Sequence, residues 1–387
     1  MASRSFARFL PLLLVFATVD RCVDSAAAES LVDGPPLEVS TIAGNGTEPL
    51  SGDGGPAVKA GVGQPFGLVV GPDGALYVCA TSNHAIRRVD LKTGLISTVV
   101  GTGRKGYAGD SGPADKAECN EPYELRFDKA GHLYEVEMKN HVVRVVDAKT
   151  KAIRTIVGTG MAGFDAAEDG GPALKARLNQ PHSIALGTGP ADGKLFIADI
   201  LNHRVRVVDL AAGTIQTFAG TGEKGNVPDM VPVVATPVSG PRAMDFDERG
   251  VMFLALREGN ALLKIDLGAK APLYERLAGT GKSGYTGHGG PARDALLSGP
   301  KGVALDRHGD VYLADTESHT IRVVRAKTGI IETVVGDGKP GDGPDGPPLK
   351  CRLNRPHGVF VDGSGILYIG DSSNHKVRRL DLKRGSP

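Results

Sequence analysis

Hydrophobic residues occur along the chain in short runs of four to six, separated by turns rich in Gly, Asp and Asn. Runs such as LYVCA (76–80) and IRRVDL (86–91) are too short for helices and rich in strand-forming residues, so they predict β-strands. Residues 64–103 and 299–338 each contain, in the same order, a proline, four apolar runs and similar intervening turns. The pattern therefore predicts a repeated unit of four strands.

A proline opens each unit and recurs at spacings of 56 to 60 residues, at Pro65, Pro122, Pro181, Pro241, Pro300 and Pro356. A period of this length with four short strands per unit is typical of a β-propeller blade. The sixth unit lacks a fourth strand, and the missing copy, VSTIAG, stands before the first unit at residues 39–44. We predict an all-β, six-bladed β-propeller of four-stranded blades over residues 38–383, closed by residues 39–44 completing the last blade.

Two further repeated features are predicted to be structural. Variants of GDGGPA recur in the long loops that join each fourth strand to the next unit, and we expect a turn followed by a short helix there. Asp199, Asp315 and Asp371 each stand four residues before a histidine of the turn after the second strand. Aspartates at such turns usually accept backbone N–H bonds.

The turn between the second and third strands carries the sequence that suggests a family. It is written SNHAIRRVD (82–90), KNHVVRVVD (139–147), LNHRVRVVD (201–209) and SNHKVRRLD (373–381). These turns resemble those of the NHL-repeat family, which implies a six-bladed propeller of the superfamily that also contains gluconolactonase-like and amidating-lyase propellers. The family includes binding modules, sensor domains and a few enzymes, so the function has to be argued from the site.

The N-terminal sequence predicts export. Arg4 and Arg8 precede the apolar run at 9–19, and small residues follow at 26–28. We expect a signal peptide at 1–28, a short linker at 29–37 and a periplasmic or secreted product. Eleven apolar residues are too few to cross a bilayer and no longer run occurs, so no membrane span is expected. The 45 basic and 44 acidic residues nearly balance, which argues against a nucleic-acid partner. We expect a monomer.

The residue after each unit-opening proline should ring the mouth of the central channel. This column reads Phe66, Tyr123, His182, Arg242, Lys301 and His357. Five of the ten histidines occupy the repeated turn, and of the rest only His182 and His357 fall in the mouth column. They belong to blades three and six, which oppose each other in a six-membered ring.

A divalent metal, zinc or calcium, is a possible cofactor at this mouth, with His182 and His357 as the candidate ligands. The amidating lyase that the chain resembles holds zinc with three histidines, each following a proline, and here the third is missing. Two imidazoles seldom hold zinc without a further protein ligand, which Glu124 or Glu137 could supply. The column also lacks the carboxylates and amides that bind calcium in gluconolactonase-type propellers.

Blades two and four depart most from the repeat. They should place Tyr123, Glu124 and Glu137 at the mouth, with Arg242 there and Arg257 close by. Either a Glu–Arg network fills the channel, or Arg242, Arg257 and Lys301 donate to a polar or anionic small ligand.

We favour a non-enzymatic, exported binding module that takes a ligand or a protein partner through its top rim and channel mouth. The alternative is a metal-dependent hydrolase or lyase, gluconolactonase-like or amidating-lyase-like, with its site at the same mouth. No catalytic residue is assigned from the sequence, because no nucleophile or phosphate-binding motif stands out.

Overall fold

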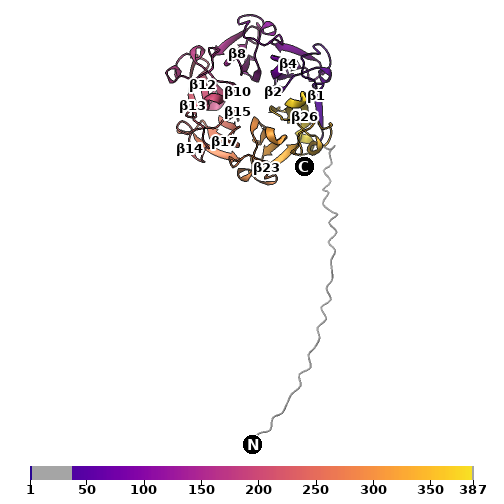
Figure 1. The fold of residues 1–387 in the computed structure, drawn as a ribbon, viewed down its shortest axis with the longest axis vertical. Helices are drawn as coiled ribbons and strands as arrows, with labels where there is room; N and C mark the ends of the chain where they lie inside the picture. The colour runs from indigo at the N-terminus through magenta and orange to yellow at the C-terminus, as the bar shows by residue number, and fades with distance from the viewer. Residues whose placement is uncertain (2–36, 386–387) are drawn as a thin grey trace. The chain divides into compact units, whose positions relative to one another are not determined.

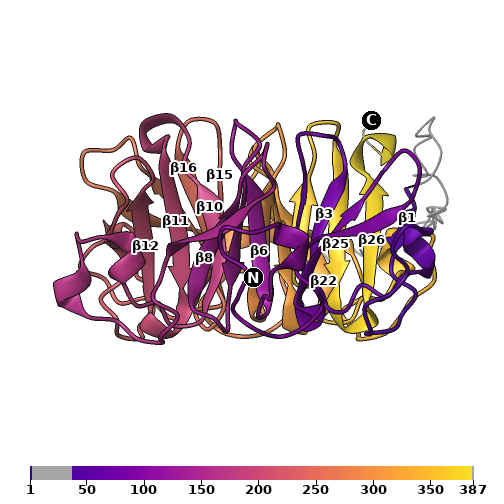
Figure 2. The ribbon, with the colours of Figure 1, turned by 90° about the horizontal axis from the view of Figure 1, so that it is seen from above.

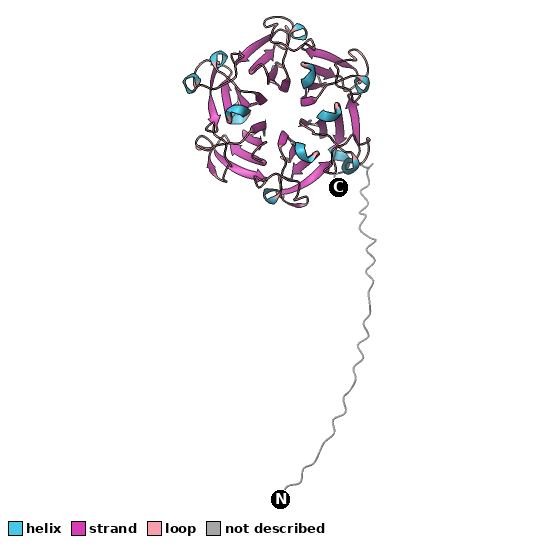
Figure 3. Cartoon of the chain, viewed as in Figure 1, coloured by secondary structure: helices cyan, strands magenta, loops and turns pink. Residues whose placement is uncertain are grey.

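The computed structural model describes Met1 and residues 37–385, and the latter belong to one compact unit. The predicted signal peptide at 1–28 and the linker up to residue 36 lie outside the described residues and remain predictions. Six antiparallel sheets form a ring around a central axis (Figure 1). Strands make up the sheets and the helices are short 3₁₀ turns in the connections (Figure 3), so the predicted all-β six-bladed propeller is confirmed.

Blades one to three contain four strands each, which follow one another in the chain from the innermost strand to the outermost. Blade one has β2 (Pro65–Val70), β3 (Leu76–Ala80), β4 (Ala85–Val89) and β5 (Ile96–Val100). Blade two has β6 (Pro122–Phe127), β7 (Leu133–Glu137), β8 (Val142–Val146) and β9 (Ile153–Val157). Blade three has β10 (Pro181–Leu186), β11 (Lys194–Asp199), β12 (Arg204–Asp209) and β13 (Thr214–Ala219).

Blades four and five add a two-residue strand from the preceding loop to the outer edge. Blade four has β15 (Pro241–Phe246), β16 (Val251–Leu256), β17 (Ala261–Asp266), β18 (Leu273–Ala278) and β14 (Val231–Pro232). Blade five has β20 (Pro300–Leu305), β21 (Val311–Asp315), β22 (Thr320–Val324), β23 (Ile330–Val335) and β19 (Gly290–Pro291). Blade six has β24 (Val359–Val361), β25 (Ile366–Asp371), β26 (Lys376–Asp381) and β1 (Val39–Ala43).

The predicted closure of the ring is confirmed. Strand β1, the first of the chain, pairs antiparallel with β26, the last, in the register Val39↔Leu380 and Ala43↔Val377. Figure 1 shows the indigo β1 beside the yellow β26. The pairing covers both strand edges that the first and last units would otherwise expose.

The 3₁₀ helices fall into two repeated groups and three single cases. Those in the inter-blade loops are η1 (Ala57–Lys59), η3 (Ala114–Lys116), η5 (Ala173–Lys175), η8 (Ala292–Asp294) and η10 (Pro348–Lys350), as predicted for the GDGGPA variants. Those in the repeated turn are η2 (Thr81–Asn83), η7 (Ile200–Asn202), η9 (Thr316–Ser318) and η11 (Ser372–Asn374). The others are η4 (Ala166–Glu168), η6 (Gly189–Ala191) and η12 (Leu382–Gly385). No helix in the described part of the chain is long and apolar enough to span a bilayer.

The hydrophobic core lies between the blades. Each core cluster joins apolar side chains of two neighbouring sheets, for example Ile197 of blade three with Val136 of blade two, or Leu313 of blade five with Leu262 of blade four. Seen from the side, the inner strands such as β6, β10 and β15 run through the thickness of the ring (Figure 2). Both faces of every sheet are covered by neighbouring sheets. This explains why inner strands such as β2 and β20 are almost continuously apolar in sequence.

Buried arginines tie the long loops to the blades, and we call this arrangement the loop clamp. The third strand of five blades supplies the arginine, at Arg87, Arg144, Arg206, Arg322 and Arg378, each at most 1% exposed. Arg87, for example, donates to the carbonyls of Gly61 and Ser51 and to the Asp53 carboxylate of the preceding loop. One guanidinium thereby closes several turns of a loop that has little core of its own.

The turn histidines are structural, as predicted. His84, His141 and His319 adopt left-handed conformations, with φ of 53° to 56°, and each accepts through Nδ1 a backbone N–H of the next blade. The glycine after the fourth strand completes the same contact. Gly101 has φ of 86°, and a Cβ there would lie 2.4 Å from the carbonyl oxygen of His84, so only glycine fits.

We expect Arg378→Ala to lower the free energy of unfolding by about 3–5 kcal/mol, because the buried Asp371 would lose its partner and Thr41 of the closing strand would lose a bond. Denaturant unfolding measures the loss, and hydrogen exchange at residues 39–43 reports the opening of the ring. Arg379→Ala is the matched control, since the exposed neighbour should change stability by less than about 0.5 kcal/mol. Equal effects of both variants would contradict the loop clamp.

Candidate functional site

A local irregularity of the inner strands positions the mouth residues. In blades one to five the register with the second strand shifts just after the proline, as between Pro122 and Glu124. The intervening residue is left out of the ladder, and such a bulge re-aims a side chain. The structure joins five of the mouth residues in a chain of contacts, in which His357 touches Phe66, Phe66 touches Tyr123, and Tyr123 touches both His182 and Arg242.

Four of these side chains form a row of rings from consecutive blades. His357 stacks on Phe66 at 4.0 Å between ring centroids, Phe66 lies 4.5 Å from Tyr123, and Tyr123 lies 4.5 Å from His182. We call this the aromatic row. All four residues are less than 10% exposed. The two histidines therefore lie at the ends of a continuous stack, and Phe66 and Tyr123 separate them along it.

Hydrogen bonds define the tautomer of both histidines. Nδ1 of His182 lies 2.6 Å from the carbonyl oxygen of Gln180, and Nδ1 of His357 lies 2.8 Å from that of Arg355. A carbonyl can only accept, so Nδ1 carries the proton and Nε2 is the free basic nitrogen. Burial, reinforced by nearby cations, holds the pKa of both imidazoles well below the usual value, so both are neutral near pH 7.

The two histidines are not part of the group of convergent ligand side chains that the described residues contain. Among the described residues, one group of three His, Cys, Asp or Glu side chains could hold an ion, and it consists of Cys119, Glu135 and Glu137. Neither histidine has two further ligand side chains around it. Of the two acids that the sequence offered as a third ligand, Glu137 belongs to that other group and Glu124 is paired with Arg126.

Arg242 is the central cation of the mouth. It is 2% exposed, and its guanidinium carbon lies 4.4 Å from the centroid of the Tyr123 ring while Nη2 donates to the Tyr123 hydroxyl. No carboxylate among the described residues lies within ion-pair distance of it. Burial lowers the pKa of Arg242, and the neighbouring Arg257 adds to this effect.

Lys301 forms the other cationic part of the mouth. Its Nζ lies 2.8 Å from Oε1 of Glu317, which also pairs with Arg355 at 2.8 Å. Lys301 is 6% exposed, and burial lowers its pKa to about 8 despite the Glu317 bond. Arg257 differs from both, because its side chain is 44% exposed and pairs with Glu258 at 3.2 Å. The structure thus places Arg257 outside the buried set.

Glu124 lies below the mouth, on the same inner strand as Tyr123. Its Oε1 accepts from Nη1 of Arg126 at 2.6 Å. Arg126 is largely buried, and the carboxylates of Glu124 and Asp245 are the nearby negative charges that stabilise its guanidinium. The Glu–Arg network considered from the sequence therefore exists, but with Arg126 rather than Arg242 or Arg257. Arg126 and Asp245 were not identified from the sequence. Both stand four residues after a unit-opening proline, where the other blades carry Val69, Ala185, Ala304 and Phe360.

Glu137 does not reach the mouth. It is fully buried within blade two, where it accepts from the backbone N–H of Asn120 at 2.8 Å and from Nη1 of Arg144 at 3.0 Å. This corrects the expected placement, because Glu137 pairs with Pro122 beside the bulge, on the strand that stays regular, and its side chain enters the loop clamp. Asp199, Asp315 and Asp371 do the same in their blades, each accepting a backbone N–H as predicted.

Family models and relatives agree with this architecture. A Teneurin NHL domain model matches residues 276–341, and an NHL repeat model matches residues 353–380. Protein SUPPRESSOR OF QUENCHING 1, chloroplastic, of Arabidopsis thaliana is 26% identical over 295 residues, which cover 73% of this chain and 27% of that protein. NHL repeat-containing protein 2 of Gallus gallus is 25% identical over 346 residues, covering 82% of this chain and 46% of that protein. The chain spans less than half the length of both relatives.

Solved structures resemble the fold. An auxiliary nutrient binding protein from Bacteroides ovatus superposes with a TM-score of 0.64 at 18% identity, covering 89% of this chain and 76% of that chain. A putative gluconolactonase superposes with a TM-score of 0.54 at 12% identity, covering 92% and 96%. At these identities the likeness concerns the fold alone.

The ring of six sheets, closed by its first strand, defines the class of the protein as a six-bladed β-propeller. The repeated His-containing turns and the matching family models add that residues 276–341 and 353–380 carry NHL-type sequence.

The mouth should make stability depend on pH above 8. The folded protein releases the Lys301 proton at a pKa of about 8, whereas an unfolded lysine keeps it to about 10.4, so unfolding takes up a proton between these values. Across this window we expect the wild type to gain up to about 1.4 kcal/mol per pH unit relative to Lys301→Met. Denaturant unfolding of both proteins at pH 7, 8, 9 and 10 tests this. A pH-independent difference would contradict it.

Proposed function

We propose that this chain is an exported NHL-repeat propeller that binds a small anionic ligand, such as a carboxylate, at the mouth of its channel. The observation that carries the proposal is Arg242, a buried guanidinium without a carboxylate partner among the described residues. Burying an unpaired charge costs several kcal/mol, and a desolvated cation–π contact recovers about 2 kcal/mol of it. An incoming anion would supply the missing partner.

Comparison with the other buried arginines sharpens this point. Each arginine of the loop clamp has a carboxylate within ion-pair distance, for example Arg87 with Asp53 at 2.7 Å and Arg206 with Asp169 at 2.8 Å. The protein therefore pairs its buried arginines wherever they serve the fold. Arg242 is buried without such a carboxylate, and it stands in the mouth column, where the blades differ most from one another.

The surroundings of Arg242 suit a small organic anion. Lys301 offers a second cation. Its ammonium has three donor hydrogens, so it can donate to a ligand while it stays bonded to Glu317. His182 and His357 contribute neutral imidazoles, and the aromatic row provides an apolar surface beside the charges. A few convergent polar groups on an apolar wall are the usual composition of small-molecule sites.

Metal-dependent hydrolase or lyase chemistry is the second candidate. The observation that favours it is the pair of neutral imidazoles whose Nδ1 atoms are held by carbonyls, since this leaves each Nε2 able to ligate a metal or accept a proton. The absence of a third ligand side chain beside either histidine in the described structure places it behind the binding function.

We expect Arg242→Met to abolish or weaken anion binding at least tenfold, because a charge-assisted hydrogen bond contributes about 1.5–3 kcal/mol. Acetate, succinate, citrate, sulfate and inorganic phosphate are the probes, and calorimetric titration with the shift in unfolding midpoint is the measurement. Without anion, Arg242→Met should be at least as stable as the wild type, because it removes an unpaired buried charge.

Arg249→Met is the matched control, because Arg249 lies in the same blade at the other end of β15 with an 82% exposed side chain. It should bind the probes as the wild type does. Binding of a probe that is equal in wild type and Arg242→Met, or a loss of stability in Arg242→Met as large as that of Arg378→Ala, would contradict the proposed role.

The metal alternative predicts that a His182→Ala/His357→Ala variant loses a divalent ion that the wild type retains. Elemental analysis of both purified proteins, after growth with added zinc and separately with added calcium, measures this. The binding function instead predicts identical metal contents in the two proteins.

A further inference from the structure

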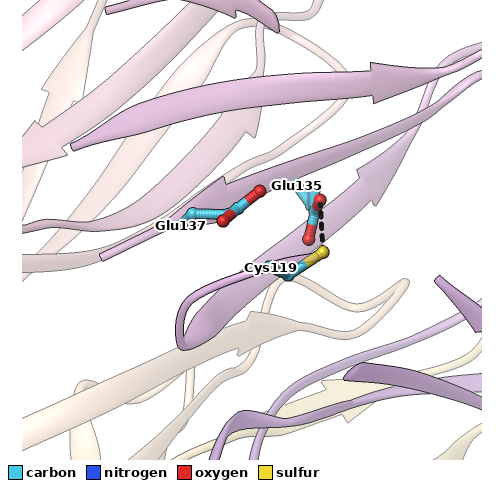
Figure 4. Close-up of side chains that lie close together, drawn as sticks. All are labelled: Cys119, Glu135 and Glu137. Atoms are coloured by element: carbon cyan, nitrogen blue, oxygen red, sulfur yellow. Dashed lines mark hydrogen bonds between the residues drawn. The ribbon is translucent and has the colours of Figure 1, made fainter. Parts of the chain in front are cut away.

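We propose a zinc site inside blade two, formed by Cys119, Glu135 and Glu137 and distinct from the channel mouth. The three side chains converge from the inter-blade loop and from β7, and their ligand atoms all lie within 4.8 Å of one another (Figure 4). All three residues are completely buried. The proposal is independent of the binding function, because none of these residues belongs to the mouth.

The internal repeat shows that two of these residues replace apolar core residues. Cys119 stands three residues before a unit-opening proline, and the corresponding residues in the other units are Val62, Leu178, Val238, Leu297 and Leu353. Glu135 is the third residue of its apolar run, and its counterparts are Val78, Ile197, Leu254, Leu313 and Ile369. Two neighbouring core positions have therefore changed together, in one blade, into side chains that ligate metals.

Glu135 has no structural task that explains its burial. Its Oε1 lies 3.9 Å from Sγ of Cys119, and its Oε2 has no hydrogen-bond partner. In the ladder it lies opposite Arg144, yet Arg144 donates to Glu137, to Asp110, to loop carbonyls and to Sγ of Cys119, at 3.9 Å, rather than to Glu135. A buried carboxyl oxygen without a partner costs about 1–3 kcal/mol or more, and a bound ion would satisfy it.

The loop clamp explains Glu137 but not the other two residues. In blade three a loop aspartate, Asp169, the clamp arginine Arg206 and a second aspartate, Asp199, form the same arrangement without a nearby thiol or additional acid. In blade six the arrangement includes a further acid, Asp342, and the Cys351 thiol lies nearby. Arg144 in blade two is likewise paired with Asp110 at 2.6 Å and Glu137 at 3.0 Å. Cys119 and Glu135 are thus additions to a clamp that is already complete.

The donor set selects the metal. A thiolate with carboxylate oxygens suits Zn²⁺, whereas Ca²⁺ and Mg²⁺ require oxygen ligands throughout. The Cys119 sulfur, both oxygens of one carboxylate and one oxygen of the other would together give the zinc four ligand atoms.

The test uses the full chain produced in medium with added zinc, so that the ion can enter before the loop closes over the site. We expect one zinc per chain by elemental analysis. With cobalt in place of zinc, we expect a thiolate-to-cobalt charge-transfer band in the near ultraviolet. The double variant Cys119→Val/Glu135→Ile should contain no zinc and show no such band.

The substitutions are chosen to keep the blade folded. The other units carry valine or leucine at the position of Cys119, and valine, isoleucine or leucine at the position of Glu135. The double variant should unfold at a temperature no lower than that of wild type produced without zinc. Cys79→Ala and Cys351→Ala are the matched thiol controls, since alanine occurs at the corresponding positions of other units, for example Ala198 and Ala295. Both should keep one zinc per chain.

The His182→Ala/His357→Ala variant separates this site from the mouth and should also keep its zinc. The proposal is overturned if wild-type protein produced with zinc contains none and unfolds at the same temperature as protein produced without it. It is equally overturned if the double variant at Cys119 and Glu135 retains the zinc, or if the histidine variant loses it.

Discussion

The ring depends on a buried guanidinium that hydrogen-bonds a long, Gly-rich loop to the blade that follows this loop in the chain. The loops contain few apolar residues, so packing alone would hold them weakly. In blade six, Arg378 bonds to Asp342 and Asp345 of the loop, to Thr41 of the closing strand and to Asp371 of its own sheet. One side chain thereby joins the loop, the ring closure and the blade. A charged group can serve this purpose in the interior because Arg378 donates to three carboxylates and a hydroxyl.

Blade four shows how the same requirement is met without that arginine. Leu263 occupies the third-strand position, and Arg276 of the neighbouring strand donates instead to the carbonyls of Val227 and Gly279. His288 of blade five offers a parallel case, since its Nδ1 accepts the backbone N–H of Thr333 where other loops use an aspartate. The repeat therefore preserves contacts rather than residues, which leaves individual positions open to change when a contact can be made from elsewhere.

Periodicity made the blades, the closure by residues 39–44, the loop helices and the turn histidines predictable, because each recurs with the same spacing in most units. The placement of single side chains was harder to predict. Glu137 was expected at the mouth, but the bulge after Pro122 directs Tyr123 toward the channel, while Glu137 stays in the regular ladder. Arg126 and Asp245 lie deeper in the channel, at a column where only two of six units are charged. The direction of a side chain beside a bulge depends on backbone geometry that the residue pattern does not contain.

Arg242 and the loop-clamp arginines show why function is best sought where the units differ. The same side chain is buried in both settings, yet only at the mouth does it lack a carboxylate within the described structure. The pair Cys119 and Glu135 departs from its columns in the same direction, from residues that stabilise a core to residues that weaken it when unpartnered. A ring in which every blade packs against two neighbours can tolerate such substitutions. Both departures leave buried groups that a ligand or an ion, rather than the fold, would complete.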